Sequence, residues 1–204
     1  MEGTPEVDPG ARRRLALTAV AAVAALAAII ALALVASGGS SEPTEFPPGK
    51  APAPGDNLKV EATANAAGCS ASNPQSEGQI ETGGAVDYQS DPPHSGNHSP
   101  QPAQDAAYRS EPPPDENLVH TLFHGRVVVW FSPDLDDAQL GALKALYDES
   151  PEHVLLVPRD TMDSEVAATA WTHLLTCPTL EDATFDAIRA FRDRWRDQGP
   201  EFVP

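Results

Sequence analysis

The sequence predicts an α+β domain: a small, mostly antiparallel or mixed sheet with two main helices, preceded by one N-terminal transmembrane helix and a loop-rich segment. Three observations support this. Residues 15–36 are a long apolar run. Residues 127–131 and 154–157 are short continuous apolar runs that are typical of buried strands. Two further segments, one after each of these runs, have the apolar periodicity of a helix.

The N-terminal apolar run extends from Leu15 to Ala36, and Thr18 is its only polar residue. As a helix it would reach about 33 Å, enough to cross a hydrocarbon core of roughly 30 Å. Three arginines directly precede it and no Lys or Arg follows until Lys50. This bias predicts a single-pass protein of the cell membrane, with residues 1–14 as a cytoplasmic tail and the remainder extracytoplasmic. A cleaved signal peptide is the alternative, and it exports the same domain.

The net charge of −17 belongs entirely to the chain beyond this run, because residues 1–36 carry equal numbers of acidic and basic side chains. Nucleic acid is excluded as a partner, since phosphate binding requires a basic footprint that this chain lacks. The acidity also argues against electrostatic docking onto anionic lipid. The predicted contact with the membrane is therefore the N-terminal helix.

Composition divides the exported part into a linker and one domain. Residues 37–57 are rich in Gly, Ser and Pro and predict a disordered linker. Residues 58–199 are long enough for one extracytoplasmic α+β domain. Up to about residue 114 the many Gly, Pro, Asn and Ser residues predict loops with short strands, for example over residues 58–60 and 85–88.

The second half of the domain is more regular. After the strand at 127–131, Asp136 or Asp137 is expected to cap a helix. Residues 154–157 predict a second strand, residues 166–175 favour a third, and residues 181–197 predict an amphipathic final helix with arginines towards its C-terminal end. This order indicates helices covering one face of a small sheet.

The chain has two cysteines, Cys69 and Cys177, one in each half of the domain. In an oxidising compartment an even count at distant positions predicts one disulfide that ties the loop-rich half to the core. A redox pair or a pair of metal thiolates is the alternative, but the CxxC spacing is missing.

Four of the six histidines fall within residues 94–124. His120 and His124 form an HxxxH pair, and a helix capped by Asp115 and ending at Gly125 would bring their rings within about 6 Å, whereas a strand would separate them by about 13 Å. The turn-rich loop at 92–98 could add His98. Three imidazoles suit zinc or copper, and Met162 would favour copper.

The same histidines also fit a purely structural role, either solvated or bonded to backbone carbonyls. The HExxH metalloprotease motif is absent because Thr121 follows the first histidine, so no catalytic residue is predicted. His153 and His173 are isolated and are expected to be structural or on the surface.

Residues 91–98 read DPPHSGNH and residues 111–125 read EPPPDENLVHTLFHG. With these two motifs in order, the chain resembles the bacterial family called domain of unknown function 3105, over about residues 60–198. The family usually reads NPPTSGPH and then LVHNLEHG, so His98, His120 and His124 fall on motif positions. His94 replaces a usual Thr, and Phe123 replaces a usual Glu. The resemblance implies an exported, often membrane-anchored domain without an established role.

The leading expectation is a membrane-anchored extracytoplasmic domain that binds copper or zinc through His98, His120 and His124, with Met162 as a further ligand. The alternative is a metal-independent module of the cell envelope that binds a protein partner and in which the histidines are structural. A metal-assisted hydrolase is a third hypothesis, but it lacks a convincing general base.

Overall fold

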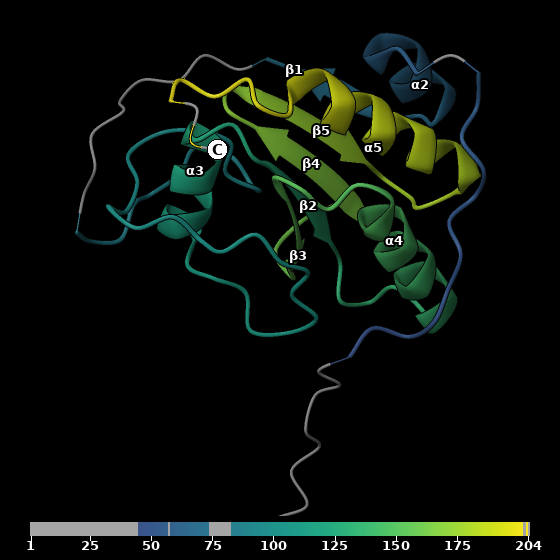
Figure 1. The fold of residues 1–204 in the computed structure, drawn as a ribbon, viewed down its shortest axis with the longest axis horizontal. Helices are drawn as coiled ribbons and strands as arrows, with labels where there is room; N and C mark the ends of the chain where they lie inside the picture. Colours follow the sequence, from purple (N-terminus) through teal and green to yellow (C-terminus); the bar gives the residue numbers. More distant parts are fainter. Residues whose placement is uncertain (1–44, 57, 74–82, 202, 204) are drawn as a thin grey trace, which may run out of the picture. The chain divides into compact units, whose positions relative to one another are not determined.

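The computed structural model describes residues 45–56, 58–73, 83–201 and 203 (Figure 1). The predicted cytoplasmic tail and transmembrane helix, residues 1–14 and 15–36, lie outside the described residues. Within the described part of the chain, no helix has the length and apolar character needed to span a bilayer.

The described residues form an α+β domain around one five-stranded mixed sheet, as predicted. The strand order is β1-β5-β4-β2-β3. The β2·β3 pair is parallel and the other three pairs are antiparallel. The strands are β1 (Ser70–Ser72), β2 (Val127–Phe131), β3 (Val154–Pro158), β4 (Val166–Ala170) and β5 (His173–Cys177).

The apolar segment predicted as one strand over residues 166–175 is a pair of antiparallel strands. β4 and β5 are joined by a tight turn at Trp171 and Thr172, and Thr172 has a φ of 61°. The sequence does not predict this turn, because no Gly or Pro interrupts the apolar segment. Thr169, in the middle of β4, accepts a buried hydrogen bond of 2.8 Å from the indole of Trp130.

Both faces of the sheet are covered, which corrects the expectation of helices on one face. Side chains alternate along a strand. In β2, Val127, Val129 and Phe131 therefore enter one apolar cluster, whereas Val128 and Trp130 enter a second on the opposite face. Continuous apolar runs rather than alternating ones are the sequence signature of such double coverage.

Four helices are described, two longer and two shorter (Figure 1). The predicted main helices are α4 (Asp137–Glu149) and α5 (Asp182–Trp195). Asp136 caps α4 by accepting a 2.8 Å hydrogen bond from the Gln139 backbone N–H. Both pack on the first cluster. The shorter helices are α2 (Val60–Ala66) and α3 (Asp115–Phe123), and α3 packs on the second cluster.

The start of the loop-rich half differs from the prediction. Residues expected to begin a short strand at 58–60 instead lead into α2, whose Thr63 and Ala64 are buried against α5. The predicted disulfide between Cys69 and Cys177 is confirmed, and it links the residue before β1 to the end of β5. Closing a loop of 108 residues stabilises the fold by roughly 4–5 kcal/mol through the entropy of the unfolded chain.

Residues 45–56, predicted as part of a disordered linker, lie extended against α4 and α5. Phe46 packs edge-on against Phe131, with ring centroids 5.9 Å apart. The buried guanidinium of Arg189 donates to the Pro52 carbonyl at 2.6 Å and also pairs with Glu149 and Asp186. The folded domain thus begins before residue 58, because a few apolar and backbone contacts suffice to order a Pro-rich segment.

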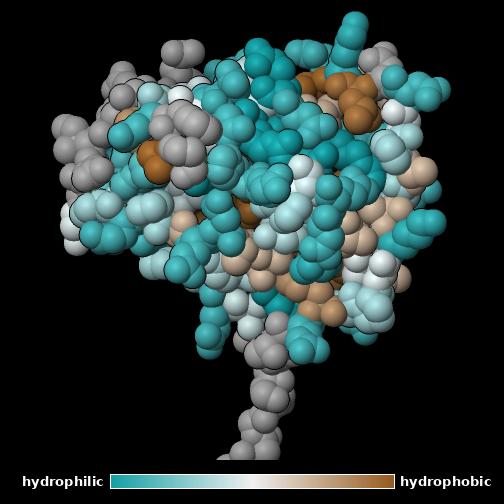
Figure 2. Space-filling view, in the orientation of Figure 1, coloured by the Kyte–Doolittle hydropathy of each residue, from teal (hydrophilic) through white to brown (hydrophobic). Residues whose placement is uncertain are grey.

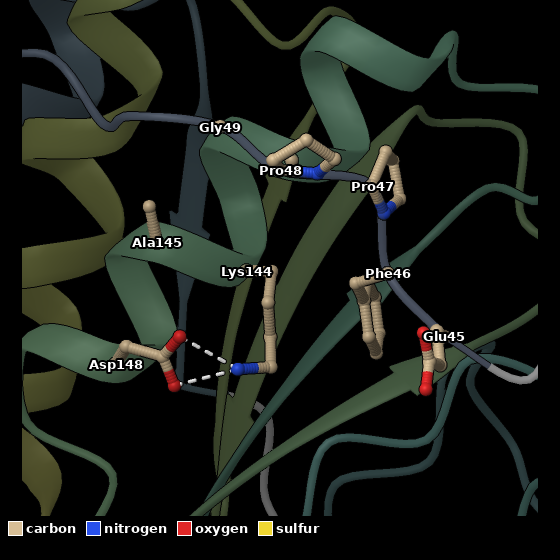
Figure 3. Close-up of a pocket in the computed structure, with 9 residues that line it drawn as sticks. Glu45, Phe46, Pro47, Pro48, Gly49, Lys144, Ala145 and Asp148 are labelled. Atoms are coloured by element: carbon tan, nitrogen blue, oxygen red, sulfur yellow. Dashed lines mark hydrogen bonds and ion pairs between the residues drawn. The ribbon is translucent and has the colours of Figure 1, made fainter.

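This N-terminal segment and α4 also enclose an open pocket of about 540 Å³. Figure 3 shows Phe46, Pro47, Pro48 and Gly49 running past the helix, with Lys144 and Asp148 paired on its next turn. The segment crosses α4 closely because both residues at the crossing are glycines. A Cβ on Gly141 would lie 2.6 Å from the Pro48 carbonyl oxygen.

The face of the domain shown in Figure 2 is mostly hydrophilic, with smaller apolar areas between the polar side chains. This agrees with the strongly acidic composition.

Gly141→Ala is expected to destabilise the protein by about 1–3 kcal/mol. At an ordinary exposed helix position this change stabilises by about 1 kcal/mol. Here the new methyl would displace the backbone of residues 48–49. Urea unfolding measures the change, and hydrogen exchange at residues 46–55 locates it. A more stable variant with unchanged exchange would contradict the close crossing.

Candidate functional site

The helix α3 carries the HxxxH pair, and its sequence explains where the helix begins and which of its faces is buried. Asp115 and Glu116 lie in its first turn, where carboxylates favour the helix dipole. Pro114 occupies the N-cap position predicted for Asp115. Leu118 and Leu122 are fully buried in the second cluster, which fixes the face that points to the sheet.

The C-terminal end of α3 is a Schellman motif. Gly125 has a φ of 85° and donates to the Leu122 carbonyl at 2.9 Å, while Arg126 donates to the Thr121 carbonyl at 3.2 Å. The last helical residue is Phe123, and Gly125, predicted at the C-cap, is the residue that follows the cap. His124 becomes the C-cap residue, one helical turn after His120.

The loop that carries His98 runs along α3 and is hydrogen-bonded to it. The Ser99 N–H donates to the Glu116 carbonyl and the Ala103 N–H to the Asn117 carbonyl, both at 3.1 Å. These bonds fix the loop and the helix as one unit.

Arg159, at the end of β3, joins the two histidine-bearing segments at their beginnings. Its guanidinium pairs with the carboxylate of Asp91, which precedes the loop that carries His98. It also pairs with the carboxylate of Asp115 at the start of α3, with an N–O distance of 2.8 Å. It also lies 5.2 Å from the centre of the Trp130 ring. These two carboxylates raise the pKa of Arg159 against the opposing effect of burial.

The structure brings the three predicted imidazoles together. The ring centroids of His98 and His120 are 4.9 Å apart, and those of His120 and His124 are 4.3 Å apart. The Nε2 atoms of His120 and His124 are separated by 2.9 Å. His98 is fully buried, His120 is 4% exposed and the His124 side chain is 14% exposed.

Backbone carbonyls hold the other ring nitrogen of the two buried histidines. Nδ1 of His98 lies 3.0 Å from the Gly96 carbonyl, and Nδ1 of His120 bonds the Ser99 carbonyl. A carbonyl can only accept, so both Nδ1 atoms donate and, in neutral rings, both Nε2 atoms carry a lone pair, which in His120 accepts a hydrogen bond from His124 Nε2. Nε2 of His98 is buried, and it has no hydrogen-bond partner among the described residues.

Aromatic rings surround the cluster. Phe123 lies 4.9 Å and Trp171 5.9 Å from the His98 ring, centroid to centroid. Met162 is partly buried against the same apolar cluster as these two side chains. Burial, and then the neighbouring His120, lowers the pKa of His124, whereas the carboxylate of Glu201 raises it. Glu201, missed in the sequence because it is remote from both motifs, lies 3.8 Å from His124 Nε2.

The remaining histidines have other partners. His94 is buried, and its Nδ1 lies 2.8 Å from the Ser95 hydroxyl. His153 pairs with Asp197 at 2.6 Å. His173 stacks on Trp195 with ring centroids 3.4 Å apart.

In the described part of the chain, no group of three or more His, Cys, Asp or Glu side chains is placed so that it could hold a metal ion. The histidine cluster therefore consists of one close pair, His120 and His124, and a third imidazole, His98, that packs beside it.

Fold and site together define a class: a disulfide-linked α+β domain with three clustered histidines on a loop and a short helix. Residues 79–202 match the family described as "Protein of unknown function (DUF3105)", and the chain belongs to this family. This confirms the family predicted from the two motifs. No curated protein and no solved structure matches the chain.

Arg159→Met is expected to destabilise the protein by about 1–3 kcal/mol, because two carboxylates lose a charge-assisted partner. The side-chain resonances of His98 and His120 should shift together, since both segments lose the same tether. Arg194→Met, on the exposed side of α5, serves as the control. Unfolding free energies and NMR spectra measure both effects, and unmoved histidine resonances would contradict the tethering role.

Acid is expected to destabilise the fold through His173. Burial, then Arg194 and His94, lowers the pKa of His173 from its ordinary value of 6.5. As the pH falls below about 6.5, the unfolded chain takes up a proton before the folded chain does, so stability decreases until the lowered pKa is passed. His173→Phe should therefore lose less unfolding free energy between pH 7 and pH 5 than the natural protein. Equal losses in urea titrations would refute this.

Proposed function

We propose that this domain binds one transition-metal ion, copper or zinc, through His98, His120 and His124, for storage, delivery or sensing on the outer side of a membrane. The apolar run at 15–36 would anchor it, with Arg12, Arg13 and Arg14 on the cytoplasmic side. The disulfide between Cys69 and Cys177 supports an oxidising location.

The observation that carries the proposal is the buried Nε2 of His98, to which the described part of the chain offers no hydrogen-bond partner. A polar atom buried without a hydrogen bond costs about 1–3 kcal/mol, so native proteins rarely retain one without a reason. A metal ion bound by this lone pair would remove that cost.

The tautomers of the cluster support the same conclusion. In metal sites the ligating histidine commonly donates its other ring N–H to a carbonyl or carboxylate, which orients the ring. His98 and His120 both have this second interaction, on the Gly96 and Ser99 carbonyls. The Nε2 lone pair of His98 is thus available for an ion, and that of His120 becomes available once its hydrogen bond with His124 is given up.

The spacing of the pair requires only a small adjustment. Two nitrogens on a tetrahedral zinc ion, at Zn–N distances of about 2.0–2.1 Å, lie roughly 3.3 Å apart. Nε2 of His120 and Nε2 of His124 are 2.9 Å apart, which suits a hydrogen bond between them. For both nitrogens to bind one ion, the Nε2 proton of His124 would move to its Nδ1, and the two Nε2 atoms would separate by about 0.4 Å. Met162 is the predicted additional ligand that would favour copper.

The competing proposal is a metal-independent module of the cell envelope. The carbonyl bonds of His98 and His120 support it as well, since they fasten the loop to α3 without any ion. The two proposals differ in whether metal changes the stability of the protein.

The test is elemental analysis and thermal melting of the purified full-length protein after removal of metal and addition of Zn²⁺ or Cu²⁺. We expect about one ion per chain and a higher melting temperature. His124→Gln should lose both effects and remain folded, because His124 is the least buried of the three imidazoles. His153→Gln, a change of an outlying histidine, is the matched control. A metal-free protein whose melting does not respond to either ion would overturn the proposal. Crosslinking of a specific partner in membranes would then support the alternative.

A further inference from the structure

The C-terminal segment after α5 runs back over the end of α3. The Asp197 N–H donates to the Gly125 carbonyl at 2.7 Å, and the Glu201 N–H donates to the Phe123 carbonyl at 3.1 Å. Arg126 donates to the Val203 carbonyl beyond it. Backbone contacts thus hold the segment directly beside the helix turn that carries His124.

Two glycines allow this close approach. A Cβ on Gly199 would lie 2.2 Å from the Gly125 backbone nitrogen and 2.4 Å from the Phe123 carbonyl oxygen. Any other residue at 199 would push the segment away from α3. The position of residue 201 therefore depends on backbone packing and not on its own side chain.

This packing places a carboxylate at the open side of the histidine cluster. The Glu201 Oε2 atom lies 3.8 Å from His124 Nε2, and its side chain is 63% exposed, whereas that of His124 is 14% exposed. Rotation of the Glu201 side chain is enough to change its distance from the imidazole pair without moving the backbone.

We propose that Glu201, in place of the thioether of Met162, is the ligand that completes the metal site, and that it makes the site selective for Zn²⁺ and Cu²⁺ over Cu⁺. This inference rests on the proposed function. Three neutral imidazoles leave the full charge of a divalent ion, and one carboxylate reduces it by one. Carboxylate oxygen is a ligand for divalent ions, whereas Cu⁺ is selected by soft sulfur ligands. As the most exposed of these ligands, Glu201 is also the first to exchange with solvent or a recipient molecule.

The test is a competition titration of the full-length protein against chromogenic chelators with Zn²⁺, Cu²⁺ and, under reducing conditions that spare the disulfide, Cu⁺. Glu201→Gln removes the charge and keeps the shape. We expect it to weaken Zn²⁺ and Cu²⁺ binding by roughly tenfold to a hundredfold, the range seen when supporting groups of metal sites are lost. Cu⁺ binding should stay within about twofold. Glu61→Gln, on the exposed first turn of α2, is the matched control and should change none of the three.

A second variant separates ligation from a merely structural effect. Gly199→Ala keeps the carboxylate but displaces the segment that carries it, so it should show the same loss for divalent ions alone, with melting measured in parallel. If the natural protein binds no ion, the proposed function fails. If it binds ions and Glu201→Gln binds all of them equally well, or loses Cu⁺ to the same extent, the role of Glu201 is overturned while the histidine site stands.

Discussion

The structure depends on the burial of β2 from both sides. Its five residues are all buried, and their side chains enter two separate apolar clusters. A strand of this kind is stable only when both faces of the sheet are covered. The helices α4 and α5 cover one face. The other is covered by α3 and by loop residues such as Tyr88, Ala103 and Tyr108, which explains why a segment with so little regular structure is nevertheless folded.

The histidine cluster follows from this arrangement. α3 is short and most of its contacts with the sheet are apolar, so its polar backbone and side-chain groups bond to the adjacent loop. That loop therefore passes directly beside His120, and the His98 ring packs against both Phe123 and Trp171. Arg159 pairs with the beginnings of both segments from the end of β3. The loop that carries His98 and the helix α3 lie on the face of the sheet and are linked to it through a small number of contacts. Changes at those contacts should therefore move the imidazoles together.

The segments at the two ends of the described domain each pack on a different helix, and both do so through a close contact between two glycines. Near the N-terminal side, Gly49 crosses Gly141 of α4; near the C-terminal side, Gly199 crosses Gly125 after α3. In each case two backbones approach more closely than any side chain allows. Neither crossing leaves a periodic or charged signal in the sequence, because its signature is the absence of a side chain. This is why residues 45–56 were expected to be disordered and why Glu201 was not expected near the histidines.

The sequence by itself determined the α+β class, the strands at 127–131 and 154–157, the two main helices, the disulfide pairing and the family. Each of these rests on local periodicity, capping residues or a count of two cysteines, which are properties of neighbouring residues. It also predicted that His98, His120 and His124 cluster, because an i, i+4 spacing on a helix fixes one pair. Only the tertiary structure decided that α3 covers the second face of the sheet, that Nε2 of His98 is buried with no partner in the described part of the chain, and that Glu201 lies beside His124. These facts depend on contacts between segments far apart in the chain, and burial and backbone approach there are set by packing that no local pattern encodes.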